Sequence, residues 1–165
     1  MNPALRSLVL IDDNEDDLCI LRLLVQRAGL TNPVHAFAQA ENAMAFLSTM
    51  ADTQTPEHSV LPLACFVDVK MAGFDGFEFI EWVRNHAVFR RVPLIALTAS
   101  DAPDDLTTAA RLGAQCYVVK FPPAAVVREL AQQAGAFHLD GNAHAFDFPG
   151  NLFLGRPSLP RVTTH

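Results

Sequence analysis

Short apolar runs alternate with longer amphipathic segments along most of this chain. The runs hold few polar residues, which is typical of strands buried on both faces of a parallel sheet. The five predicted strands cover residues 8–11, 34–37, 63–67, 93–97 and 116–119. The polar segment 51–62 contains two prolines and is predicted to be a loop.

Apolar residues recur every three or four positions in the segments that follow these runs, which is the period of an amphipathic helix. The five predicted helices cover residues 16–28, 40–50, 76–87, 103–112 and 123–134. Gly29 and Gly113 follow two of them as stop signals, and Pro103 opens the fourth. The alternation predicts an α/β fold, a doubly wound five-stranded parallel sheet flanked by five helices.

The length of 165 residues suits one domain with a short extension. Half of the residues are hydrophobic and 18% are charged, which is enough apolar material for a core. We expect a domain at residues 1–134 and a tail at 135–165. The tail keeps six large apolar residues, Phe137, Phe146, Phe148, Leu152, Phe153 and Leu154. It is therefore expected to dock, over its own domain or across a homodimer; a loose tail is the alternative.

Charge and cysteine content narrow the choice of partners and compartment. The formal net charge is −6, and an acidic chain without a basic face predicts no nucleic-acid partner. No apolar run reaches the roughly 18 residues that a membrane-spanning helix needs. Cys19, Cys65 and Cys116 lie in apolar surroundings without CxxC spacing. This pattern predicts buried thiols in a reducing compartment, the cytoplasm.

Polar residues with related chemistry follow four of the predicted strands. Asp12 and Asp13 come after the first strand, Asp68 after the third, Thr98 after the fourth and Lys120 after the fifth. Because parallel strands end at the same edge of a sheet, these side chains are expected to meet in one cleft. Carboxylates suit Mg²⁺, whose charge also offsets their mutual repulsion. With a lysine and a hydroxyl beside them, the group predicts a site that handles phosphoryl groups, with a carboxylate as nucleophile.

The first predicted strand is followed by six polar residues, five of them acidic. We assign Glu15, Asp16 and Asp17 to the first turn of the next helix, where the helix dipole favours acidic side chains. Only Asp12 and Asp13 are assigned to the cation. The alternative is that these two are solvated loop acids ahead of the helix.

Four motifs occur in order at these strand ends: IDDNEDD, FVDVKMAGFDGFEF, PLIALTAS and LGAQCYVVK. In combination they resemble the receiver domain of two-component response regulators, over about residues 6–134. The resemblance implies a flavodoxin-like receiver fold with Asp68 as the phosphoacceptor and Mg²⁺ as the cofactor. It also implies that Asp13 binds the metal directly and Asp12 mostly through water, with Asp68 and the backbone carbonyl of Lys70 as further ligands.

The same resemblance implies roles for three residues on the last two strands. Lys120 would contact the phosphoryl group, and Thr98 would move to bind it. Tyr117 would be the aromatic switch that repacks when Thr98 moves; a plain core or surface aromatic is the alternative. Such a protein is not a conventional enzyme but a phosphoacceptor, with Mg²⁺-dependent self-phosphorylation and autodephosphorylation.

Two positions near the expected site depart from the family pattern or leave alternatives open. The family normally has proline directly after the lysine, with a cis bond, whereas here Phe121 separates Lys120 from Pro122. A cis Lys-Phe bond would cost about 2.5–4 kcal/mol, so we predict trans there and any cis bond at Phe121–Pro122. The side chain of Lys70 is predicted either to lie over the phosphoryl group or to point to solvent.

These features predict a single-domain response regulator that accepts a phosphoryl group on Asp68 from a histidine kinase and signals by protein–protein contact. The segment 51–62 and the stretch NEDDLCILRLLVQRAGLTNPVHAFAQAENAMAFL look like stand-alone receivers that partner bacterial phytochrome-type histidine kinases. A homodimer through the last helices and the tail is expected. One alternative is a degenerate receiver that binds proteins without phosphorylation. Another is a haloacid-dehalogenase-type phosphatase, which needs an aspartate where Lys70 stands.

Overall fold

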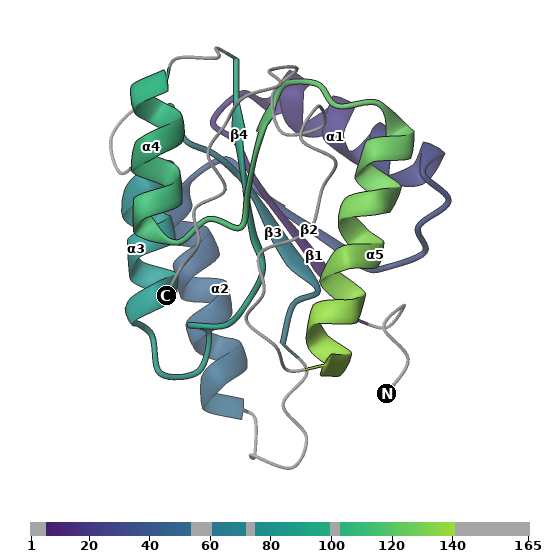
Figure 1. Cartoon of the computed structure of the whole chain (residues 1–165). Helices are drawn as coiled ribbons and strands as arrows, with labels where there is room; N and C mark the ends of the chain where they lie inside the picture. Colours follow the sequence, from purple (N-terminus) through teal and green to yellow (C-terminus); the bar gives the residue numbers. More distant parts are fainter. Residues whose placement is uncertain (1–5, 54–60, 72–74, 100–102, 141–165) are drawn as a thin grey trace.

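The computed structural model describes residues 6–53, 61–71, 75–99 and 103–140, and it consists of alternating strands and helices (Figure 1). The strands are β1 (Leu8–Ile11), β2 (Val34–Phe37), β3 (Ala64–Asp68), β4 (Leu94–Thr98) and β5 (Cys116–Val119). The helices are α1 (Glu15–Arg27), α2 (Ala40–Thr53), α3 (Gly76–Asn85), α4 (Pro103–Leu112) and α5 (Ala124–Asp140). The tail predicted to dock lies mostly outside the described residues, as does most of the predicted loop 51–62.

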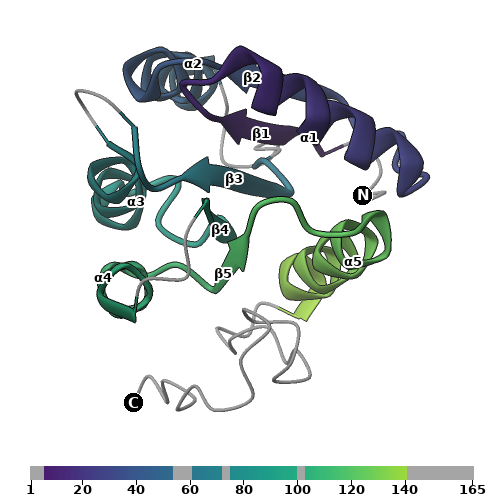
Figure 2. The ribbon, with the colours of Figure 1, turned by 90° about the horizontal axis from the view of Figure 1, so that it is seen from above.

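All five strands are parallel and form one sheet in the order β2-β1-β3-β4-β5. Helices α1 and α5 cover one face, and α2, α3 and α4 cover the other (Figure 2). Leu8 and Leu10 of β1 belong to the core beneath α1 and α5, while Val9 and Ile11 belong to the opposite core. The strands are apolar throughout because both faces are covered. The predicted doubly wound α/β fold is confirmed.

Several element ends differ from the predictions by a few residues. Strands β3 and β4 begin and end one residue later than predicted, so Asp68 and Thr98 are their last residues. Helix α2 continues to Thr53, and α3 stops at Asn85 rather than 87. The prediction that the last helix ends at 134 is wrong, because α5 runs to Asp140. Gly135 resembles a stop signal in the sequence but is buried inside this helix.

Two of the three cysteines are placed as predicted. Cys65 and Cys116 are buried on β3 and β5, whereas Cys19 is exposed, so the prediction of a buried thiol is wrong at that position. Cys19 follows the buried Leu18 on α1, and one residue of helical rotation carries it off the core-facing side. Among the described residues, no helix combines the length and apolar character that a bilayer crossing requires.

The start of α3 lies directly against the end of β3. A Cβ atom on Gly76 would lie 2.1 Å from the carbonyl oxygen of Asp68 and 2.7 Å from Cα of Val69. Only glycine therefore allows this approach. Asp75 caps the helix, with its side chain accepting a hydrogen bond of 3.0 Å from the backbone N–H of Glu78. The cap and the glycine together fix the main chain behind Asp68.

Arg84 of α3 joins several segments at the opposite end of the sheet. Its guanidinium donates to the carbonyl oxygens of Gly113 at 2.8 Å, Arg90 at 3.0 Å and Val92 at 2.7 Å, and to Oε1 of Gln115 at 2.6 Å. Burial lowers the pKa of Arg84 to about 10. Gly113 has φ +111°, and a Cβ there would lie 2.8 Å from Cγ of Arg84. The absence of a side chain at Gly113 thus leaves room for the side chain of Arg84.

Candidate functional site

The predicted site residues gather at the carboxyl edge of the sheet. Asp12 and Asp13 directly follow β1, Asp68 ends β3, Thr98 ends β4 and Lys120 follows β5. Asp12 and Thr98 are fully buried, and Asp68 is only 4% exposed. Strand β1 pairs with β3, β3 with β4 and β4 with β5, so the four strand ends lie next to one another. The sheet therefore brings together the residues that the sequence placed in one cleft.

Three carboxylates form an oxygen cluster at this edge. One oxygen each from Asp12, Asp13 and Asp68 lies within 4.8 Å of the other two. Asp12 and Asp68 are buried, and Asp13 is exposed to solvent. The description of Asp12 as a solvated loop acid is therefore wrong. An all-oxygen, largely anionic donor set with one open side fits a hard divalent cation such as Mg²⁺, which keeps several waters when bound.

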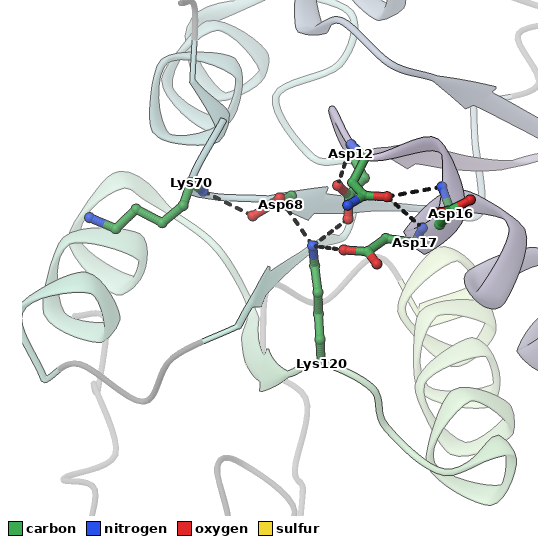
Figure 3. Close-up of polar contacts among 7 residues, drawn as sticks. Asp12, Asp16, Asp17, Asp68, Lys70 and Lys120 are labelled. Carbon is green, nitrogen blue, oxygen red and sulfur yellow. Dashed lines mark hydrogen bonds and ion pairs between the residues drawn. The ribbon is translucent and has the colours of Figure 1, made fainter. Parts of the chain in front are cut away.

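Lys120 points its ammonium group into the same cluster (Figure 3). Its Nζ lies 3.1 Å from Oδ2 of Asp68 and 3.0 Å from Oδ2 of Asp17, and it forms a further ion pair with Oδ2 of Asp12. The Lys120 side chain is only 6% exposed. Burial acts to lower the pKa of Lys120, but the three carboxylates outweigh burial and raise the pKa above its ordinary value. The site therefore holds a fixed positive charge beside Asp68.

Asp17 belongs to this site, contrary to its assignment to the helix start alone. Its backbone N–H does take part in the cap, donating to Oδ1 of Asn14 at 3.2 Å, as does that of Asp16 at 2.9 Å. Its side chain, however, reaches Lys120. The position of Asp17 in the sequence could have indicated this contact. Helix α1 begins just beyond the carboxyl end of β1, so residues of its first turn lie beside the cluster.

The surroundings of Asp68 hold its pKa above the ordinary value, although the carboxylate stays the main form at pH 7. Burial raises the pKa of Asp68 to about 6, and the negative charge of Asp12 acts in the same direction. The backbone N–H of Lys70, 2.9 Å from Oδ1, and the ammonium of Lys120 oppose this shift. A divalent cation in the cluster would add positive charge and favour the carboxylate. The Asp68 oxygens are thus held by one backbone donor and one ammonium.

The side chain of Lys70 adopts neither of the two predicted positions. It turns away from Asp68 toward α4, where its Nζ lies 3.0 Å from Oδ1 of Asp105 (Figure 3). It therefore neither lies over Asp68 nor simply points to solvent, although the side chain is 61% exposed. The role of its backbone carbonyl as a metal ligand stays a prediction.

The prediction of a trans Lys120–Phe121 bond is wrong. This peptide bond is cis, and it is the only cis bond in the part of the chain that the structure describes, so Phe121–Pro122 is trans. Lys120 itself is held by tertiary contacts at its main chain and at its side chain. Its backbone N–H donates to the carbonyl of Thr98 at 2.7 Å, and its ammonium is held by the carboxylates.

Thr98 and Tyr117 lie on neighbouring strands. Thr98 pairs in register with Val119, and Tyr117 pairs with Ala96. Tyr117 is 2% exposed and belongs to the core beneath α2, α3 and α4. It is therefore a core aromatic in this state of the protein. Its repacking with Thr98 stays a prediction.

Comparisons with known proteins agree with this geometry. The family model of the response regulator receiver domain matches residues 8–131. The response regulator Rcp1 of Synechocystis is 24% identical over 119 residues, which cover 72% of this chain and 78% of Rcp1. An uncharacterised 14.6 kDa protein of Leptolyngbya boryana is 31% identical over 138 residues, 83% of this chain and 96% of that protein. The solved structure of the bacteriophytochrome response regulator AtBRR aligns with TM-score 0.65 and 26% identity, covering 81% of this chain and 94% of that one.

Proposed function

Because this chain belongs to the response regulator receiver family of two-component signalling, we propose that Asp68 accepts a phosphoryl group from a partner histidine kinase. The phosphorylated domain then signals through contact with other proteins. The observation that carries this proposal is the nearly buried Lys120 ammonium, which lies 3.1 Å from Oδ2 of Asp68 beside a carboxylate cluster. A fixed cation at this distance stabilises the charge that develops on a transferring phosphoryl group.

In the proposed transfer, a carboxylate oxygen of Asp68 attacks the phosphorus atom of the kinase phosphohistidine. A new O–P bond forms while the P–N bond to the imidazole breaks, and the imidazole nitrogen leaves with the bonding pair. Lys120 holds an oxygen of the transferring group as a point charge. Asp12, Asp13, Asp68 and the Lys70 carbonyl would hold Mg²⁺, which supplies further charge stabilisation when bound.

The acyl phosphate is proposed to shift a two-state equilibrium that involves Thr98 and Tyr117. Thr98 ends β4, the strand next to the one that ends at Asp68, and this adjacency supports the proposed role. Tyr117 lies on β5 two residues before Val119, the register partner of Thr98, and shares a core with residues of α4. Movement of Thr98 would therefore alter the packing beneath that helix.

The partner is proposed to be a histidine kinase of the phytochrome type. The likeness to Rcp1 and to the bacteriophytochrome response regulator AtBRR supports this choice. A homodimer through the last helices and the tail, and a cytoplasmic location, stay predictions.

Two alternatives compete with this function. A degenerate receiver would bind partners without phosphorylation, but it would not need a lysine and two further carboxylates around Asp68. A phosphatase with an aspartate nucleophile needs a second aspartate two residues later as its acid–base group. Lys70 stands there, with its ammonium 3.0 Å from Asp105. The receiver function is favoured over both.

We expect uptake of a phosphoryl group to depend on a divalent cation. Incubation of the full chain with a small phosphodonor such as acetyl phosphate should add one phosphoryl mass in the presence of Mg²⁺. Removal of the cation with a chelator should abolish the adduct, because the carboxylates around Asp68 then repel the anionic donor. The readout is the intact mass. No adduct in Mg²⁺ would favour the degenerate receiver, and an equal adduct in chelator would exclude the cation site.

A further inference from the structure

The ammonium of Lys120 is shared among carboxylates from three segments. Asp12 follows β1, Asp17 lies in the first turn of α1 and Asp68 ends β3. The ammonium donates hydrogen bonds to Asp17 and Asp68, and Oδ2 of Asp12 is paired with it by charge without a hydrogen bond. Two of the partners, Asp12 and Asp68, also belong to the oxygen cluster suited to a divalent cation, whereas Asp17 does not. Lys120 and a cation therefore share two ligands.

The two oxygens of each shared carboxylate have different partners. Oδ1 of Asp12 accepts the backbone N–H of Asn14 at 3.0 Å, and Oδ1 of Asp68 accepts that of Lys70 at 2.9 Å. In both residues the other oxygen, Oδ2, faces Lys120. The carboxylate oxygens that are not held by the backbone are thus the ones occupied by the ammonium. A cation that binds through these oxygens competes with Lys120 for them.

We propose that Asp17 is a positioning residue that holds the Lys120 ammonium when Asp12 and Asp68 turn to the cation. Its carboxylate oxygen lies 3.0 Å from Nζ, and its side chain is 24% exposed at the rim of the site. The backbone of Asp17 is fixed by the cap at Asn14. Without this partner, the nearly buried ammonium has only the two metal ligands to compensate its charge, and it competes with the cation more strongly.

This inference rests on the proposed function, because it concerns the cation that phosphoryl transfer would use. The alternative is that the negative charge of Asp17 only interacts favourably with the dipole of α1. Asp16 offers a matched control for that explanation. It lies in the same turn, its side chain is exposed, and its backbone N–H donates to the same Oδ1 of Asn14. Asp16→Asn removes the same charge from the helix start without touching the Lys120 partner.

The test is calorimetric titration of the full-length chain with Mg²⁺ alone. Asp17→Asn should weaken Mg²⁺ binding about tenfold, whereas Asp16→Asn should change it less than about twofold, as expected for an exposed charge. Asp17→Glu, which keeps a carboxylate, should recover part of the affinity. In a Lys120→Met background, Asp17→Asn and Asp16→Asn should have the same small effect, because no ammonium competes for the ligands.

Each outcome decides the question. Equal affinities of Asp17→Asn and Asp16→Asn, with normal binding by the wild type, would overturn the role of Asp17 and leave the proposed function intact. A deficit of Asp17→Asn that persists without Lys120 would show a direct effect on the cation and would also overturn it. No Mg²⁺ binding by the wild type would overturn both proposals. If thermal melting shows that Asp17→Asn does not fold, Asp17→Ser is compared in the same way.

Discussion

Replacement of Lys120 by Met is expected to slow phosphoryl uptake by Asp68 about 100-fold or more, the usual cost of removing one preorganised charge-stabilising donor. The Lys120 side chain is 6% exposed and meets Asp68 at 3.1 Å, so solvent does not screen its charge strongly. The methionine side chain is similar in length to that of Lys120, so it preserves the packing of the aliphatic part of that side chain. The rate falls because the developing charge on the phosphoryl oxygens loses its nearest fixed cation.

The measurement is the initial rate of adduct formation with a small phosphodonor in saturating Mg²⁺, followed by intact mass. Lys70→Met is the matched control, because it removes an equal charge two residues from Asp68 while its ammonium faces Asp105 instead. We expect the control to change the rate only a few-fold. Thermal melting of both variants establishes that they are folded. Equal rates for Lys120→Met and the wild type would refute the role of the ammonium.

Replacement of Arg84 by Met is expected to lower the free energy of unfolding by about 2–4 kcal/mol, the range for leaving several buried acceptors unpaired. Arg84 donates to three backbone carbonyls and one side-chain amide, which belong to the segments that lead into β4 and β5. Methionine fills much of the same volume but donates no hydrogen bond. The oxygens of Val92, Gly113 and Gln115 would then lack this donor.

Chemical denaturation with a fluorescence readout from Trp82 measures this loss. Arg22→Met is the matched control, because Arg22 is exposed on α1, and we expect it to change the free energy by less than about 0.5 kcal/mol. Phosphoryl uptake by folded Arg84→Met should remain near the wild-type rate, since Arg84 lies at the far end of the sheet. A loss no larger than that of the control would show that the network contributes little.

The fold could be predicted because its strands have a recognisable pattern of apolar residues. Strands covered on both faces must be apolar, so β1, β3 and β4 appear as short uninterrupted apolar runs. Topology then places the ends of parallel strands at one edge, which is why Asp12, Asp68 and Lys120 could be grouped without a structure. The ends of the helices were harder to predict from the sequence. Glycine often ends a helix, yet α5 continues through Gly135 to Asp140.

The contacts that were missed all depend on tertiary packing. Asp17 reaches Lys120, which is 103 residues away in the chain, and no periodicity encodes such a pair. Lys70 meets Asp105 on a helix whose position is set by the whole sheet. The cis bond before Phe121 departs from the local preference for trans, which is the only information that the sequence gives at this bond. Local chemistry thus grouped most residues of the candidate site, and tertiary packing determined which side chains contact one another there.

Asp68 is proposed to be the phosphoacceptor, and the position of the phosphoryl adduct in the chain tests this role. Wild type and Asp68→Asn are treated with the same phosphodonor in Mg²⁺, and the phosphoryl group is mapped by peptide mass spectrometry. We expect one phosphoryl group on the wild-type peptide that contains Asp68, and none on folded Asp68→Asn. An adduct of equal yield on Asp68→Asn, or one that maps to a different carboxylate in the wild type, would contradict it.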